Sequence, residues 1–153
     1  MYNFAIMKQG IFEKEIFIRS DVNTVMAVVS EFSQHYKVHP LIIKVEEANA
    51  PSGVLRRYFI TDQLQWGPFK FKIKYRADIL SLKENEVHTE AYQSPNTFID
   101  NLTSVTKVDS GVILKEKVIL KSPNLLFNYA FQQAQTAHEE MLKRIKAFVE
   151  NNK

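Results

Sequence analysis

No cysteine occurs among the 153 residues. This absence excludes a disulfide framework, a cysteine-based zinc site and a thiol nucleophile, and it fits a cytoplasmic protein. No apolar run approaches the length of about eighteen residues that a membrane-spanning helix needs. The segment from Met1 to Gly10 also lacks the charged start and apolar run of a secretory signal. Whether residues 1–10 form an ordered element or a loose tail stays open.

Recognisable catalytic motifs are missing as well. The sequence has no serine-centred nucleophile elbow, no glycine-rich phosphate loop and no HExxH pattern. His35 and His39 stand four residues apart, a spacing that suits a metal on a helix. However, Pro40 argues against a regular helix at this point and no third ligand is evident. We therefore expect neither a metal site nor a cofactor.

The composition is that of an ordinary globular domain, with 45% hydrophobic and 24% charged residues. A chain of this length buries about two-thirds of its unfolded surface in one core. Since no repeat or linker interrupts the sequence, we predict a single domain over residues 1–153 with a core from about 11 to 151. The net charge of +3 permits an anionic partner without requiring one.

Residues 122–151 predict one long helix, with Ser122 as N-cap, Pro123 at the first helical position and Asn151 at the end. Apolar residues then recur with a period of 3.6. This stripe comprises Phe127, Ala130, Phe131, Ala134, Ala137, Met141, Ile145, Phe148 and Val149. The opposite face is rich in glutamine and glutamate, so the helix is amphipathic and should cover a core.

Seven stretches between residues 11 and 120 have the alternation or composition of strands. They are 11–19, 41–48, 54–66, 69–82, 87–93, 97–108 and 112–120. A helix that begins at Ser20-Asp21 and a short helix or turn at 33–40 separate the first two. Short turns join the other strands, which requires antiparallel neighbours. One face of such a sheet is apolar, and only the C-terminal helix is long enough to cover it.

The strand from Phe69 to Leu82 has the clearest alternation, so its solvent accessibility should alternate too. Its charged side carries Lys70, Lys72, Lys74 and Arg76. Such a stripe suits an acidic lipid surface or an RNA backbone, but the simpler interpretation is a solvated outer face. Because no stacking aromatics are interleaved there, we expect no nucleic-acid partner, and contact with a membrane surface remains an open alternative.

The order of elements resembles the helix-grip fold of the SRPBCC superfamily, which includes START domains, birch-pollen-allergen-like proteins and bacterial polyketide cyclases/dehydrases. The similarity extends over about residues 11–151. Locally, Ile16 to Val25 is similar to the opening strand and first helix, His39 to Glu46 to the proline-led second strand, and Ser52-Gly53 to the glycine turn before the third strand.

This resemblance implies an α+β fold in which a curved seven-stranded antiparallel sheet, in the order 1-7-6-5-4-3-2, wraps around the C-terminal helix. Two short helices lie between the first two strands, and an apolar ligand occupies a cavity between sheet and helix. The superfamily has no universal catalytic motif, so it implies no catalytic residue here.

Three ionisable residues are candidates for the cavity. His138 lies within the inward stripe of the C-terminal helix, and Glu116 lies on the apolar side of the last strand. Asp100 shares a face with Phe98 and Leu102. A buried carboxylate is costly unless it is paired, so His138 and Glu116 could form a structural pair, orient a ligand or act as acid and base.

Aromatic residues are numerous enough to line a cavity, although plain core packing explains them equally well. The predicted ligand-binding set comprises Tyr58, Trp66, Phe71, Tyr75, Tyr92, Phe98, Asp100, Glu116, Phe131, Ala134 and His138, with Tyr129 as a further aromatic candidate.

The leading hypothesis is a protein that binds a hydrophobic small molecule, such as a lipid, a quinone or a polyketide-like aromatic. The alternatives are a cyclase/aromatase or dehydratase in the same cavity and a protein-interaction accessory module. The oligomeric state is left open.

Overall fold

The computed structural model describes residues 6–152 and contains a seven-stranded sheet and three helical segments. The strands are β1 (Met7–Ile18), β2 (Ile42–Ala48), β3 (Arg56–Trp66), β4 (Phe69–Leu82), β5 (Glu86–Gln93), β6 (Thr97–Val108) and β7 (Gly111–Pro123). The helices are α1 (Val22–Ser30), the 3-10 helix η1 (Phe32–Lys37) and α2 (Asn124–Asn151).

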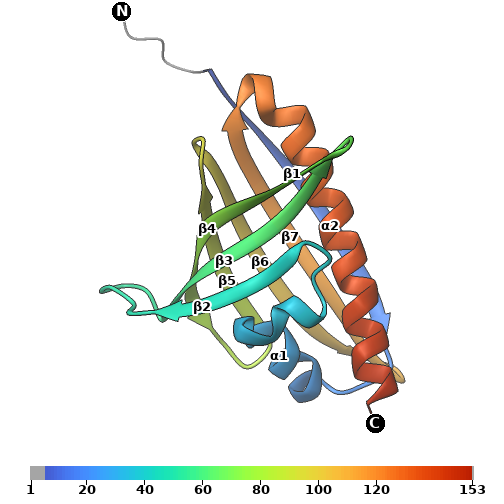
Figure 1. The fold of residues 1–153 in the computed structure, drawn as a ribbon. Helices are drawn as coiled ribbons and strands as arrows, with labels where there is room; N and C mark the ends of the chain where they lie inside the picture. The colour runs from blue at the N-terminus through green and yellow to red at the C-terminus, as the bar shows by residue number, and fades with distance from the viewer. Residues whose placement is uncertain (1–5, 153) are drawn as a thin grey trace, which may run out of the picture.

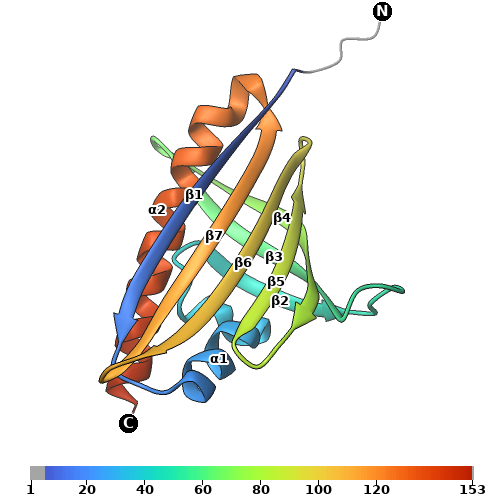
Figure 2. The ribbon, with the colours of Figure 1, turned by 180° about the vertical axis from the view of Figure 1, so that it is seen from behind.

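Every neighbouring pair of strands is antiparallel, in the order β1-β7-β6-β5-β4-β3-β2. The strongly curved sheet holds α2 on its concave side, and α1 and η1 close one end (Figure 1). Seen from behind, β1, β7 and β6 run side by side along the helix (Figure 2). The predicted α+β helix-grip fold is confirmed.

The long C-terminal helix packs against β1 and β7. Its first half approaches β1 closely at Gly10, where an added Cβ would lie 2.7 Å from the ring of Phe127 and 2.9 Å from that of Phe131. Glycine therefore allows these two stacked rings to lie directly on the strand. The predicted helix start was wrong by one residue: Ser122 is the buried next-to-last residue of β7, and Pro123 occupies the N-cap position of α2 without a side-chain cap.

The first strand begins before the predicted core boundary at about residue 11. Residues 7–10 belong to β1, where Met7 pairs with Pro123 and Gly10 with Leu120. The pairing satisfies the backbone groups at the end of β7, which would otherwise form an open sheet edge. The core therefore begins near Met7, and residues 1–5 lie outside the described residues.

The end of the domain beneath α1 is solidly packed. Ile18, Val25, Leu142, Ile145 and Val149 are all less than 5% exposed and belong to one hydrophobic cluster. Helix α1 begins as its sequence predicts, because the Asp21 side chain caps it by accepting from the Thr24 N–H at 2.8 Å. This packed end anchors the second half of α2.

The first half of β4 corrects the expected accessibility profile. Residues 69–72 are all exposed, whereas Ala77, Asp78 and Ile79 are all buried, so accessibility does not alternate. The reason is geometric: β4 pairs with β3 from Phe69 to Ile79 but with β5 only from Arg76 onward. The tip of the β3–β4 hairpin therefore projects beyond the sheet, where both of its faces meet solvent.

Candidate functional site

A cavity of about 580 Å³ lies between α2 and the concave face of the sheet. Its wall is mostly apolar and includes Ile60, Leu64, Ile73, Ile99, Leu120 and Met141. The cavity exists because α2 packs on β1 and β7 while the curved sheet carries β3 to β6 away from the helix. A volume of this size accommodates a typical small-molecule ligand.

Apolar side chains also surround the cavity at the start of α2 and on the projecting hairpin. Leu125 is 97% exposed, and Leu126, Tyr129 and Phe71 are also exposed, although all four line the cavity. Large side chains of this kind are normally withdrawn from water, so their gathering beside a cavity is a feature of binding surfaces.

The most buried polar group of the cavity is the carboxylate of Glu116, which is 1% exposed. Nδ1 of His138 lies 2.5 Å from Glu116 Oε2, and Nδ2 of Asn101 donates to the same oxygen at 2.8 Å. A carboxylate can only accept, so the histidine carries its proton on Nδ1. Three elements, β6, β7 and α2, thus converge on one hydrogen-bonded group.

The negative charge of Glu116 acts on the neighbouring imidazole of His138. Burial alone would lower the pKa of His138, but the negative charges of Glu116 and Asp62 and the hydrogen bond to Glu116 together raise it above its ordinary value. Among the described residues, Glu116 Oε1 and Asn101 Oδ1 are buried without a hydrogen-bond partner. Such unsatisfied acceptors are uncommon in purely structural networks.

A second polar group in the cavity consists of Asp62 on β3 and Tyr75 on β4. Burial raises the pKa of Asp62 to about 6, although a hydrogen bond from the Tyr75 hydroxyl, at 3.3 Å from Asp62 Oδ1, and the charge of His138 oppose the rise. Burial first, and then the nearby Asp62 carboxylate, raise the pKa of Tyr75 well above its usual value. A carboxyl that titrates near neutrality inside a cavity is typical of functional sites.

Two further histidines line the cavity. Nδ1 of His39 accepts the N–H of Leu41 at 3.1 Å, and burial, followed by the charge of His138, lowers the pKa of His39 well below its ordinary value. Its proton therefore resides on Nε2. His35 has a structural role, because its Nε2 lies 3.2 and 3.1 Å from the carbonyl oxygens of Val28 and Val29 at the end of α1.

Five of the predicted ligand-binding residues line the cavity: Phe71, Tyr75, Glu116, Ala134 and His138. The prediction missed Asp62 and Asn101. A usable signal existed for Asp62, because Tyr58, Ile60, Asp62 and Leu64 alternate along β3 and place this carboxylate among apolar neighbours.

The other predicted residues lie elsewhere. Tyr58 is fully buried and packs against Phe32 in the core, with ring centroids 5.5 Å apart. Phe131 packs between Phe127 and Phe12 over β1, outside the cavity wall. The side chain of Trp66 lies outside the described part of the structure.

Tyr92, Phe98 and Asp100 lie on the convex face of the sheet, so their predicted inward facing was wrong. Tyr92 packs against Phe98 with ring centroids 5.0 Å apart, and Asp100 pairs with His88 at 2.8 Å. The inward positions of β6 are those of Ile99, Asn101 and Thr103. Polar residues occupy both faces of this strand, which is why its facing was misassigned by one residue.

The same convex face carries the one group of three potential metal ligands found among the described residues. The ligand atoms of His88, Glu90 and Asp100 lie within 4.8 Å of one another. His88 and Asp100 already share a hydrogen bond, and Glu90 accepts from the Tyr92 hydroxyl at 3.0 Å. The geometry is accounted for without an ion.

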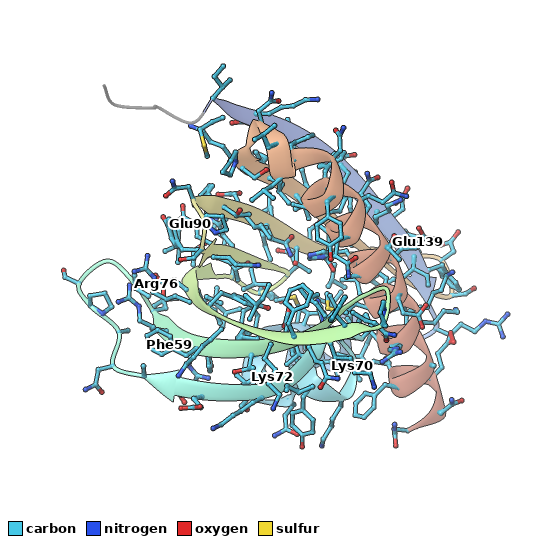
Figure 3. The ribbon with its side chains drawn as sticks, turned by 45° about the horizontal axis from the view of Figure 1, so that its top comes forward. Phe59, Lys70, Lys72, Arg76, Glu90 and Glu139 are labelled. Atoms are coloured by element: carbon cyan, nitrogen blue, oxygen red, sulfur yellow. The ribbon has the colours of Figure 1, made fainter. Side chains whose placement is uncertain are left out.

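The basic stripe of β4 lies on this convex face too. Figure 3 shows Phe59, Lys72 and Arg76 along the outer side of the β3–β4 hairpin, away from α2. Contrary to the sequence-based expectation, aromatic rings are interleaved with the stripe: Lys74 lies 5.5 Å from the Phe59 ring and Arg76 lies 4.4 Å from the Tyr92 ring. These cation–π contacts pair the charges with rings of the same sheet.

Contact with a membrane surface stays a prediction. No helix within residues 6–152 is both long and apolar enough to cross a membrane.

Comparisons with solved structures identify the fold. A START superfamily protein from Mycobacterium smegmatis aligns with a TM-score of 0.77 and 14% identity over 94% of this chain and 99% of its own. The di-domain ARO/CYC StfQ from the steffimycin biosynthetic pathway gives 0.77 and 14% over 94% of this chain, which spans 51% of StfQ. Ara h 8.0201 gives 0.68 and 16% over 94% and 99%. No family model and no curated protein matches the sequence. The chain therefore has the helix-grip fold of START-like, polyketide cyclase-like and Bet v 1-like proteins.

Proposed function

We propose that this protein binds a hydrophobic small molecule, such as a lipid, a quinone or a polyketide-like aromatic, in the cavity between α2 and the sheet. The observation that carries the proposal is the cavity itself: about 580 Å³ of mostly apolar space into which Asn101, Glu116 and His138 converge as one polar anchor. Apolar walls supply affinity and a few polar groups orient the ligand.

Filling the cavity tests this proposal directly. Ala134 lies on the cavity side of α2, whereas Ala147 is exposed on the same helix. We expect Ala134→Trp to abolish binding of the neutral fluorescent probe N-phenyl-1-naphthylamine and Ala147→Trp to leave it unchanged. Native mass spectrometry of the purified protein would identify a retained ligand. Equal probe binding by the wild type and both variants would refute binding in this cavity.

An enzyme that uses the same cavity is the second candidate, of the cyclase/aromatase or dehydratase type. The observation in its favour is the convergence of ionisable groups with shifted pKa values, above all Asp62 at about 6 and the His138 imidazole paired with Glu116. A carboxyl group that titrates near neutral pH suits a general base, and an imidazolium suits a general acid. A protein-interaction module is less favoured, because that reading expects a collapsed interior and this cavity is open.

His138 distinguishes a ligand anchor from a structural pair. If its role is structural, His138→Ala leaves Glu116 buried and uncompensated and costs about 3–5 kcal/mol of stability. If it anchors a ligand, binding weakens more than stability falls. Chemical denaturation and probe titration of His138→Ala separate these outcomes, and a large loss of stability with unchanged affinity would remove the residue from the binding site.

A further inference from the structure

Two of the histidine rings on the cavity wall lie close together although they come from different elements. His39 belongs to the segment before β2, and His138 belongs to α2. Their ring centroids are 6.2 Å apart and their planes are nearly perpendicular, at 84°. Each ring has one nitrogen engaged by the protein, Nδ1 in both cases. The other nitrogen, Nε2, has no hydrogen-bond partner among the described residues.

The protonation of each Nε2 follows from what Nδ1 does. The Leu41 N–H donates to Nδ1 of His39, so this nitrogen is bare and the neutral ring carries its hydrogen on Nε2. Glu116 accepts from Nδ1 of His138, and its negative charge favours the imidazolium, which carries hydrogens on both nitrogens. The cavity wall therefore offers two N–H donors.

We propose that the Nε2–H groups of His39 and His138 together hold the carbonyl oxygen of an otherwise apolar ligand. The proposal rests on the binding function proposed above and specifies its ligand. An oxygen at a normal hydrogen-bond distance of about 2.9 Å from Nε2 lies about 4 Å from the ring centre. Two such arms together exceed the observed separation of 6.2 Å, so one oxygen can lie within hydrogen-bond reach of both rings.

The charges of the wall favour a neutral carbonyl over a carboxylate. Asp62 and Glu116 already place two acidic groups in the cavity, and both lie close enough to His138 to act on its charge. A ligand carboxylate would add like charge in a poorly hydrated space, which is unfavourable. A ketone or aldehyde accepts both hydrogen bonds without that repulsion.

Matched ligands and matched variants test the inference. The ligands are 2-acetylnaphthalene and 2-ethylnaphthalene, which differ by a carbonyl in place of a methylene and are measured by displacement of N-phenyl-1-naphthylamine. The side-chain amide of asparagine can replace Nδ1 of a histidine, whereas that of glutamine reaches the position of Nε2. His39→Asn thus keeps an acceptor for the Leu41 N–H and loses the cavity donor, while His39→Gln restores that donor. His138→Asn likewise keeps a donor to Glu116.

The decisive quantity is the ratio of the two dissociation constants, because the cost of removing each ligand from water cancels between variants. We expect the preference for the ketone to fall roughly twofold to tenfold in His39→Asn and in His138→Asn and to be retained in His39→Gln. The C=O stretch of bound 2-acetylnaphthalene should rise in frequency in both asparagine variants.

Each other result is equally informative. A wild-type protein that binds the probe with a ratio unaffected by the asparagine variants would overturn the two-donor site and leave the binding function intact. A His39-dependent preference for 2-naphthoate over the ketone would also overturn it, in favour of an anion. Failure of the wild type to bind the probe would instead refute the proposed function.

Discussion

The concave side of the sheet has two regions that differ in how closely α2 packs against the strands. Over β1 and β7, α2 lies directly on the strands, and Phe12, Phe127 and Phe131 fill the contact. Over β3 to β6 the same helix stands away, and the side chains surround a cavity. The first region is solid packing, and the second leaves an internal space.

The cavity and the convex face also differ in how a buried aspartate is paired. Asp78, on the convex side of β4, is held by Arg57 through two hydrogen bonds of 2.8 and 2.9 Å, with Arg76 at 3.5 Å. Asp62, in the cavity, forms no salt bridge within residues 6–152 and accepts one hydrogen bond, from Tyr75. A carboxylate that is buried without a salt bridge destabilises the fold, so its presence in the cavity suits a functional role better than a structural one.

The largest expected effect tests whether the cavity region is hollow. Phe12 is 7% exposed against Phe131 and His138, so Phe12→Ala should cost about 3–5 kcal/mol of unfolding free energy. Phe71 is 36% exposed on the cavity rim, so Phe71→Ala should cost less than about 1 kcal/mol. Urea denaturation of both variants provides the comparison, and Tyr75→Ala should also cost less than Phe12→Ala. Equal and large losses at all three positions would mean that the interior is solid.

The next effect concerns Asp62 and Asp78, whose replacement by asparagine should change the stability of the protein at pH 8 in opposite directions. A pKa raised from 3.8 to about 6 means that folded Asp62 holds its proton more tightly than the unfolded chain does. Stability therefore falls as pH rises from about 4 to 6 and stays reduced above that. At about 1.36 kcal/mol for each unit of pKa, the penalty at pH 8 is at most about 3 kcal/mol.

Asp62→Asn should accordingly stabilise the protein at pH 8 and lose this advantage near pH 4. Asp78→Asn is the matched control on the neighbouring strand, and it should destabilise by about 1–3 kcal/mol because it breaks charge-assisted hydrogen bonds to Arg57. Denaturation at both pH values measures the difference. If both variants lost stability at pH 8, the distinction between the two carboxylates would be wrong.

The sequence predicted the fold well because each strand and helix has its own hydrophobic period, and β4 and β6 were bounded correctly at Phe69–Leu82 and Thr97–Val108. Periodicity is weaker at assigning faces where a strand is polar on both sides. On β6 this led to Asp100 in place of Asn101. The position of His39 depends on how a loop packs against α2, which no local pattern encodes.

The smallest expected effect isolates the one hydrogen bond that Asp62 receives. The hydrogen bond from the Tyr75 hydroxyl lowers the pKa of Asp62, against the effect of burial. Tyr75→Phe should therefore raise this pKa above about 6. The accompanying change in stability at pH 8 should be a loss of about 1 kcal/mol, the net value of one hydrogen bond. The titration of the Asp62 side-chain carboxyl carbon by NMR measures the shift.

Tyr92→Phe is the control for this last change, because the Tyr92 hydroxyl donates to Glu90 on the convex face. It removes the same atom from an exposed site and should leave the pKa of Asp62 where it is. A shift in both variants would point to a general loosening of the sheet. A shift confined to Tyr75→Phe means that the cavity itself sets the protonation of Asp62, so that a ligand which displaces the tyrosine hydroxyl would also change the charge beside it.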